Sequence, residues 1–277
     1  MYRNALVTTA ILTTLFSFHA NPTVAADPSV AAHLTTVIQE AQRRHQLFAH
    51  QVTDYTCTLV KRERIHGQLL NYEHLEVKLR HRQVENGQVV VPFSVYVKFL
   101  APAELQGREV IYVEGQNDNK LIARRGGRRF AYVTTSVDPL SDVAMERNRY
   151  PITHTGIQRL FEELLVVGQE ELNNPLDELE YRQVDGVKIN GRVCHMLEFT
   201  HPVQRDNYRY HIARIFVDDE LDLPIRHAAY DWPDEEGGKP KLLEEFTYLN
   251  LKLNVDLTDW DFDHRNEEYD FLKDFEP

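Results

Sequence analysis

Hydrophobic residues recur at helical spacing in two segments of the chain. The first begins near Pro28, which suits the first turn of a helix, with Asp27 in position to cap it. Its apolar stripe consists of Val30, Leu34, Val37, Ile38, Ala41 and Phe48. The second is predicted to begin at Thr155, with Gln158 in the capping-box position and Gly168 near its end. Its stripe consists of Ile157, Leu160, Phe161, Leu164 and Leu165. Each helix therefore has one apolar face that needs a partner.

Between and after these segments, apolar and polar residues alternate with a period of two, which predicts antiparallel strands joined by short turns. The predicted strands cover residues 55–60, 74–80, 93–99, 110–113, 120–123 and 130–134, followed by 179–184, 187–189, 193–199, 208–217, 225–230 and 242–257. Residues 135–152 show neither the helical spacing nor the strand period of two, and are predicted to form a loop.

This order of elements predicts an α+β fold that is mainly β. We expect a strongly curved antiparallel sheet, or an unclosed β-barrel, of about eleven strands. Its outer face would be polar, and the two amphipathic helices would pack on its concave face. An apolar cavity remains if the helices do not fill that concavity. The residues predicted to bind a ligand there are Tyr55, Leu59, Val77, Val95, Val97, Phe99, Leu160 and Leu164.

The first 26 residues have the pattern of a cleavable signal peptide. Arg3 provides a positive start, residues 5–18 form an apolar run, and Val24 and Ala26 occupy the positions of a small-residue cleavage site. The run is too short for a comfortable membrane span. Both cysteines lie far from the predicted cut, which excludes an N-terminal lipid anchor. We therefore predict a periplasmic or secreted protein whose residues 27–277 form a single domain.

Composition narrows the function classes. The formal net charge is −12, and an acidic protein is poorly suited to neutralise phosphates, which argues against a nucleic-acid partner. Only two cysteines are present, so a thiol-rich zinc site is excluded. In an oxidising compartment Cys57 and Cys194 can pair or remain free, and the sequence does not decide between these states.

Four arginines surround a predicted hairpin turn: Arg124, Arg125, Arg128 and Arg129. Guanidinium groups match the geometry of phosphate and carboxylate, so this cluster can contact an anionic lipid headgroup or an acidic protein partner. Such a contact would be peripheral to a membrane and not integral. The alternative is an exposed hairpin whose charges are simply solvated, and the pattern favours this alternative.

The sequence indicates no catalytic centre, cofactor or metal. Asp259, Asp261 and Asp263 have the spacing of a calcium loop, but His264 replaces its obligatory glycine, so a closing strand with outward acids is favoured. We expect His195, within an apolar strand, to be a core histidine. Glu244 and Glu245 are adjacent in a strand and should point to opposite faces, which excludes a catalytic pair. These patterns predict a protein that is not an enzyme.

Several motifs, taken in order, resemble an exported bacterial family catalogued as domain of unknown function 1571, over most of residues 35–265. They are residues 54–63 (DYTCTLVKRE), 92–99 (PFSVYVKF), 107–115 (GREVIYVEG) and 148–152 (NRYPI), the last leading to Gly156-Ile157. A weaker resemblance links the order of elements, and residues 216–226, to the LolA/LolB superfamily of periplasmic lipoprotein carriers. That resemblance implies an unclosed barrel with helices as a lid. It also implies a protein that binds a ligand, and it implies no catalysed reaction.

Two function classes follow, and a third, an envelope hydrolase, has the least support in the sequence. The first is a non-enzymatic periplasmic carrier or sensor that holds a lipid or lipoprotein acyl chain between the curved sheet and the helices. The second is an envelope protein-interaction or regulatory module whose core is filled by its own side chains and which binds a protein partner. An unfilled apolar cavity distinguishes the first class from the second.

Overall fold

The computed structural model describes residues 28–127 and 133–277. The predicted signal peptide, Asp27, Arg128 and Arg129 therefore lie outside the described residues. Three α-helices are present in the described part of the chain: α1 (Pro28–Gln51), α2 (Asp142–Met145) and α3 (Ile157–Glu171). Within the same ranges, no helix combines the length and the apolar character that a membrane span requires.

The first group of strands runs from α1 to α2. It comprises β1 (Asp54–Ile65), β2 (Gln68–Leu69), β3 (Glu73–Arg80), β4 (Gln83–Glu85), β5 (Gln88–Val91), β6 (Ser94–Ala101), β7 (Glu109–Val113), β8 (Leu121–Arg124) and β9 (Thr134–Val137). The second group follows α3 and comprises β10 (Glu180–Ile189), β11 (Arg192–Thr200), β12 (Ile212–Asp218), β13 (Leu223–Asp231) and β14 (Lys241–Leu253). Short 3-10 helices connect some elements: η1 (Asn117–Asn119), η2 (Ile152–His154), η3 (Leu176–Glu178) and η4 (Asp259–Phe262).

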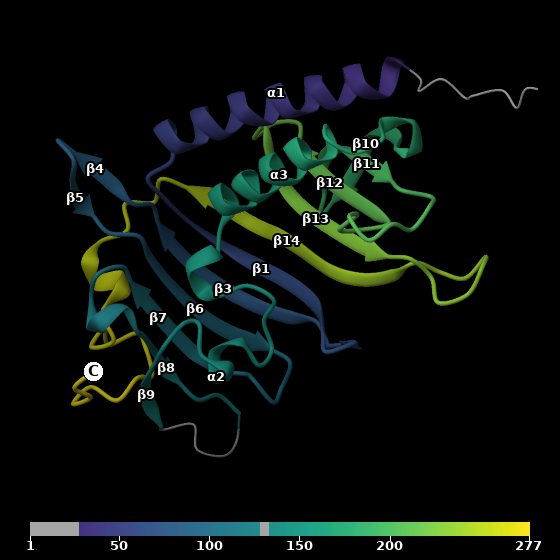
Figure 1. Cartoon of the computed structure of the whole chain (residues 1–277). Coiled ribbons are helices and arrows are strands. Elements are labelled where there is room, and N and C mark those ends of the chain that lie inside the picture. The colour runs from purple at the N-terminus through teal and green to yellow at the C-terminus, as the bar shows by residue number, and fades with distance from the viewer. Residues whose placement is uncertain (1–27, 128–132) are drawn as a thin grey trace, which may run out of the picture.

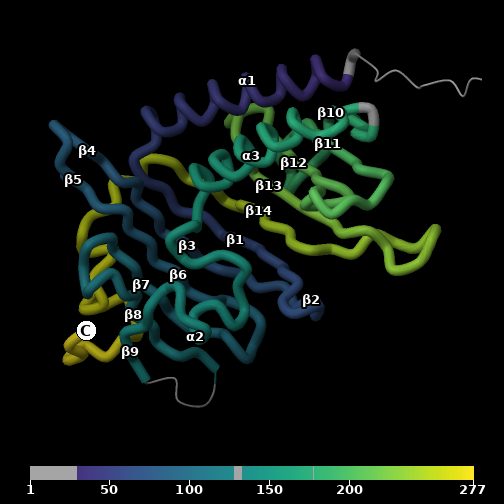
Figure 2. The backbone as a smooth tube through the Cα atoms, viewed as in Figure 1, coloured from purple at the N-terminus to yellow at the C-terminus, as the bar shows by residue number. Residues whose placement is uncertain are grey.

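The two groups join into one antiparallel sheet with the strand order β10-β11-β12-β13-β14-β1-β3-β6-β7-β8-β9. The last strand of the chain pairs with the first, since β14 lies against β1 with Tyr55 opposite Leu253 and Glu63 opposite Glu244 (Figure 2). This path contains eleven strands, β2 adds a short pair to β1, and β4 and β5 form a separate hairpin. Among the described residues the two end strands, β10 and β9, do not pair with each other. The prediction of a curved, unclosed sheet is confirmed.

Both long helices lie on the concave face of the sheet (Figure 1). α3 packs between α1 and strand β13, and α1 also contacts β10. The helix stripes predicted from the sequence are the faces that they bury, since Leu34, Ile38 and Phe161 are among the core residues. The largest apolar cluster lies between α3 and strands β1, β3, β6, β13 and β14, and a second cluster lies beneath α1 at β10, β11 and β12.

The prediction of a polar outer face was wrong on strands β6 to β8. There the convex face carries a third apolar cluster, which includes Tyr96 and Ile111. The chain after β14 folds back over this cluster and covers it with Phe262, Tyr269 and Phe271. Tyr269 stacks on Tyr96 with 4.0 Å between the ring centroids. Residues that alternate in a strand can therefore be apolar on both faces when another segment covers the outer one.

The C-terminal region also differs from its predicted strand. β14 ends at Leu253 and not at Leu257, because Asn254 and Asp256 adopt positive φ angles of 54° and 60°. Asp259, Asp261 and Phe262 lie in η4, a 3-10 helix, which replaces the predicted closing strand. Thr258 and Asp261 cap its first turn reciprocally, an arrangement that favours a helical turn over an extended strand.

Two further boundaries differ from those expected. Residues 135–152 are not all loop, since β9 pairs with β8 and Ser141 caps the short helix α2 through the amide of Ala144. β12 begins at Ile212 and not at Tyr208. Tyr208 instead stacks on His201, with 3.9 Å between their ring centroids, which places it outside the strand.

Candidate ligand-binding cavities

The first cavity lies between α1, α3 and the strands β10 to β13, and has a volume of about 600 Å³. Its lining includes Leu34, Val37, Ile38 and Ala41 from α1, Leu160, Phe161, Leu164 and Leu165 from α3, and Leu197, Phe199, Ala213, Ile215 and Val217 from the sheet. The volume of this cavity is within the range of about 300–1,000 Å³ that ligand pockets occupy. The two helices therefore do not fill this side of the concave face.

The second cavity lies on the other side of α3 and has a volume of about 510 Å³. Its apolar lining includes Leu59, Leu75, Val97, Phe99, Val110, Leu121 and Ala123 from the sheet, Leu160 and Val166 from α3, and Pro139, Val143 and Ile152 from the segment before α3. Of these, Val143 and Val166 have 75% and 48% of their surface exposed, so the outer rim of this cavity carries apolar side chains beside exposed charged ones such as Arg125 and Arg159. Both function classes were left open by the sequence, and these unfilled volumes favour a ligand.

Opposite sides of α3 face the two cavities. Phe161, Leu164 and Gly168 line the first, whereas Arg159 and Glu162 line the second. The spacing of three or four residues within each set is the spacing of one helix face. Helix α3 is therefore the partition of the concave face.

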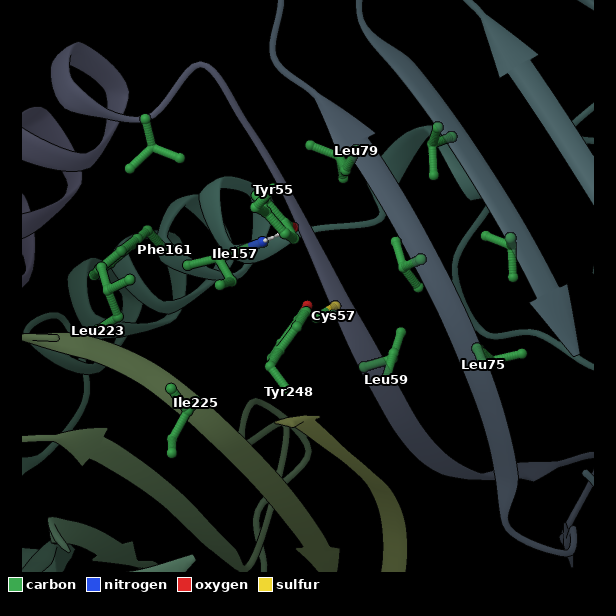
Figure 3. Close-up of a cluster of buried hydrophobic side chains, with 14 of the residues drawn as sticks. Tyr55, Cys57, Leu59, Leu75, Leu79, Ile157, Phe161, Leu223, Ile225 and Tyr248 are labelled. Atoms are coloured by element: carbon green, nitrogen blue, oxygen red, sulfur yellow. Dashed lines mark hydrogen bonds between the residues drawn. The ribbon is translucent and has the colours of Figure 1, made fainter. Parts of the chain in front are cut away.

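The start of α3 is fixed by a buried tyrosine and a glycine, not by the predicted capping box at Thr155 and Gln158. The helix begins at Ile157, whose amide donates to the hydroxyl of Tyr55 at 3.1 Å, as Figure 3 shows. Gly156, at the N-cap, has a φ of 118°, and a Cβ there would lie 2.8 Å from a methyl group of Leu79. Only glycine satisfies both the backbone conformation and the close approach. The partition is thereby attached directly to strand β1.

Gly168 lies near the end of this helix, as expected, since α3 ends at Glu171. A Cβ at Gly168 would lie 2.9 Å from a side-chain carbon of Ile38 on α1. The glycine therefore permits the close approach of the two helices above the first cavity. Packing, and not helix termination, explains its position.

Three cross-strand rows on the inner face explain where the predicted ligand residues lie. In the first row Tyr55 pairs with Leu79 and Leu79 with Val95, and all three are buried beneath the start of α3. The next row contains Val77 and Val97, and the third contains Leu59, Leu75 and Phe99. Of the predicted residues, Leu59, Val97, Phe99 and Leu160 line the second cavity, Leu160 and Leu164 line the first, and Tyr55, Val77 and Val95 line neither.

The two described arginines that were predicted to contact an anion, Arg124 and Arg125, have different surroundings. Arg124 lines the second cavity, but its guanidinium donates to the backbone oxygen of Gly107 and lies near Glu109 and Asp270, so its charge is already paired. Arg125 is exposed and lines the same cavity. A contact between these arginines and a lipid headgroup or a protein stays a prediction.

The same five residues line both cavities: Tyr150, Leu160, Glu163, His227 and Glu244. We call this set the junction. Tyr150 donates to Glu244 at 3.1 Å, and Arg149 Nε donates to the same carboxylate at 2.6 Å. Burial raises the pKa of Glu244 and lowers that of His227 from 6.5 to about 4. His227 Nδ1 is 3.9 Å from the carboxylate of Glu244, which is beyond hydrogen-bond distance.

A buried charged cluster holds the roof of the second cavity. Lys61 Nζ lies 2.5 Å from Glu63 Oε2, 3.4 Å from Glu73 Oε2 and 2.6 Å from the side-chain oxygen of Asn148. Arg147 contacts the other oxygen of Glu73 at 3.2 Å. Lys61, Glu63 and Glu73 are each less than 10% exposed. The segment 147–150 is thus attached to β1 by the hydrogen bond from Lys61 to Asn148, and to β3 and β14 by the pairs of Arg147 with Glu73 and of Arg149 with Glu244, whose carboxylates are buried.

Sequence reasoning missed this cluster, although a signal was present. Lys61 and Glu63 continue the alternation of Tyr55, Cys57 and Leu59, so the period of two already placed them on the inner face. Charged residues are rarely buried without partners, and the partners lie far along the chain. Asn148, in the motif NRYPI at residues 148–152, supplies one of these partners, since its side-chain oxygen accepts from Lys61.

Other candidate residues have structural roles. His195 is not a core histidine: its side chain is 21% exposed, lines the first cavity and lies 2.7 Å from a carboxylate oxygen of Asp219. Glu244 faces the cavities whereas Glu245 pairs with Arg226 at 2.6 Å, which agrees with the prediction of opposite faces. Cys57 and Cys194 are both free and buried.

The spaced acids near the C-terminus bind basic side chains. Asp259 accepts from Arg80 at 2.7 Å and Asp261 from Lys78 at 2.9 Å. These contacts attach the C-terminal segment to the convex side of β3. The calcium-loop spacing is therefore explained by ion pairs with the sheet.

A family model described as "Protein of unknown function (DUF1571)" matches residues 52–271 of the chain. No curated protein matches the sequence.

Solved structures that are similar to the chain include the following three, all at low identity. A DUF1329 family protein from Desulfovibrio piger is 15% identical, with a TM-score of 0.39, over 83% of this chain and 97% of that one. A LolA superfamily protein from Nitrosomonas europaea is 11% identical, with a TM-score of 0.33, over 82% and 97%. Lipoprotein LppX from Mycobacterium tuberculosis is 12% identical, with a TM-score of 0.39, over 83% and 100%. At these values none of them indicates what the chain binds.

Proposed function

The chain belongs to the DUF1571 family of proteins of unknown function, and we propose that it is a non-enzymatic binding protein for a hydrophobic ligand. The ligand is an acyl chain of a lipid or a lipoprotein, held between the curved sheet and the helices α1 and α3. The observation that carries this proposal is the pair of unfilled apolar cavities on either side of α3.

The driving force for binding is the removal of apolar surface from water. Each buried methylene group of an acyl chain contributes about 0.8 kcal/mol. The ordering of the chain and any displacement of the helices oppose binding. A self-filled core, which the protein-interaction alternative requires, offers no such volume. The cavities therefore support the carrier or sensor class over the interaction module.

The compartment is proposed to be the periplasm, on the basis of the signal-peptide pattern of residues 1–26. Exposed apolar side chains at the rim of the second cavity, Val143 and Val166, together with the neighbouring Leu140, fit a transient contact with a membrane surface or an acylated partner. Such a contact would be peripheral. It would allow an acyl chain to pass into the cavity without crossing open water.

The proposal is tested by titration with cis-parinaric acid, a fatty acid that becomes fluorescent in an apolar site. The full chain should show saturable fluorescence. The variants Leu164→Asp and Val97→Asp place a charge in the first and second cavity, and each should weaken binding at least tenfold because an unpaired buried charge is costly. Val193→Asp is the matched control, since Val193 is 47% exposed and lines neither cavity.

Circular dichroism establishes that each variant is folded before its titration is compared. Absence of saturable fluorescence in the unchanged chain, or equal binding by all four proteins, would contradict the proposal. The protein-interaction class would then be the better hypothesis.

A further inference from the structure

The two cavities adjoin at the junction. Leu160 and Glu163 of α3 lie on one side of it, and Tyr150, His227 and Glu244 lie on the other. A ligand with a single chain has no use for this arrangement, since either cavity alone is large enough to be a ligand pocket. A branched ligand, by contrast, can send one chain to each side of α3 and leave its branch point at the junction.

The junction is polar, and its two carboxylates are paired, Glu163 with Arg209 at 2.8 Å. The carboxylate of Glu244 is paired with the guanidinium of Arg149 at 2.6 Å and accepts the hydroxyl of Tyr150. His227 is neutral near pH 7, because burial lowers its pKa to about 4. Among the described residues, no hydrogen bond is formed by its ring, which nevertheless faces both cavities. Its ring N–H is thus available to an uncharged acceptor.

We propose that the two cavities together hold one lipid with two acyl chains, one chain on each side of α3, whose ester carbonyl accepts a hydrogen bond from the ring of His227. This rests on the proposed function and specifies its substrate class as a diacyl lipid. A charged headgroup is not placed at the junction, because the neighbouring cations Arg149 and Arg209 are already paired with Glu244 and Glu163. The headgroup points outward, past the rim of a cavity.

The alternative is that the cavities bind two unconnected chains independently. Native mass spectrometry with 1,2-dioleoylglycerol and with oleic acid separates the two arrangements. The proposal predicts one bound dioleoylglycerol per chain, but two bound molecules of oleic acid. Binding of two dioleoylglycerol molecules, or of none while oleic acid binds, would overturn it.

Variants that fill one cavity give a second readout. Ala41→Phe occupies part of the first cavity and Ala123→Phe part of the second. Each should lower the affinity for dioleoylglycerol at least tenfold and reduce the number of bound oleic acid molecules from two to one. Ala32→Phe, on the exposed side of α1, is the matched control and should change neither value. Unchanged dioleoylglycerol binding in both cavity variants would contradict the proposal.

The role of His227 is tested with an ether analogue, 1,2-dioleylglycerol, which lacks the carbonyl acceptors. His227→Leu should weaken binding of the diester about fivefold, the size of one lost hydrogen bond, and leave binding of the diether unchanged. Equal effects on both lipids would overturn the assignment of the ester site. If neither oleic acid nor either two-chain lipid binds to the unchanged protein, the proposed function itself fails.

Discussion

The two cavities have roofs of different kinds. The first is covered by α1, which packs through apolar side chains such as Leu34 and Ile38, while its polar side forms ion pairs between Arg43, Arg44 and Asp222. The side chains of Arg43 and Asp222 are 50% and 46% exposed. The second is covered by the segment 147–150, whose Arg147 and Arg149 pair with Glu73 and Glu244, two carboxylates that are almost wholly buried although the arginines are 27% and 35% exposed.

This difference predicts different mobility. Exposed ion pairs contribute about 0–1 kcal/mol each, because water and salt screen them. Breaking a buried pair costs about 3–5 kcal/mol, because a charge remains without a partner. The segment 147–150 should therefore stay in place while α1 can move away from the sheet.

The largest expected effect comes from the buried cluster. Lys61→Met removes the ammonium group that contacts Glu63, Glu73 and Asn148, and leaves Glu63 without its cation. We expect the free energy of unfolding to fall by about 4 kcal/mol. Urea denaturation at pH 7.5 measures it. A loss below 1 kcal/mol would contradict the view that this roof is held by charge.

A substitution at the attachment of α3 to the sheet should give the next largest loss in the free energy of unfolding. Gly156→Ala combines a disallowed backbone conformation with a methyl group 2.8 Å from Leu79, so a loss of about 3 kcal/mol is expected. Gly186→Ala is the matched control, since Gly186 also has a positive φ, of 72°, but faces open space. The control should lose about 1 kcal/mol. Equal losses in the two variants would show that contact with Leu79 has no cost.

The junction should make stability depend on pH. The pKa of His227 is lowered by burial to about 4, so between pH 6.5 and pH 4 the unfolded chain binds the proton more strongly than the folded chain. This group therefore contributes stability above pH 6.5 that is lost as the pH falls toward 4. Between pH 7.5 and pH 5 the loss is about 2 kcal/mol.

His227→Gln removes this contribution. The difference between the unfolding free energies at pH 7.5 and pH 5, measured in urea, should therefore be about 2 kcal/mol smaller in the variant. Glu244, whose pKa is raised by burial, stabilises the folded state on acidification and acts in the opposite direction in both proteins. An unchanged difference would mean that His227 is protonated equally easily in the folded and unfolded chains.

The smallest effect is expected at the exposed roof. Asp222→Asn removes both ion pairs to α1, and asparagine tolerates the positive φ of 57° at this position. The unfolding free energy should fall by less than about 1 kcal/mol, and the difference should vanish in high salt. Hydrogen exchange should also become faster in α1 but not in α3. Equal acceleration in both helices would contradict the idea that α1 moves alone.

Much of the fold was predictable, because burial imposes the periods that the sequence displays. The alternation of residues 75–79 and the stripe from Ile157 to Leu165 mark faces that are indeed buried. The return of the chain over the convex face was not predictable. Its cause is the pairing of Phe262 and Tyr269 with strands more than a hundred residues earlier, which no local pattern reveals.

The candidate site was predictable as a face but not as a cavity. Tyr55, Val97 and Leu164 all belong to the apolar interior. Which of them lines a space depends on where α3 is attached, and that attachment is made by the hydroxyl of Tyr55. The buried charges Lys61 and Glu63 were overlooked because a charged pair within an amphipathic strand is usually solvated.

Acyl chains should lie in the cavities on either side of α3. A crystal structure of the protein with dibromostearic acid would locate them, since the anomalous signal of bromine marks the position of the bound chain. Bromine peaks are expected beside Leu164 or beside Val97 and Phe99, at cavity walls. Peaks confined to the outer surface, with the cavities unchanged at saturating ligand, would contradict this placement.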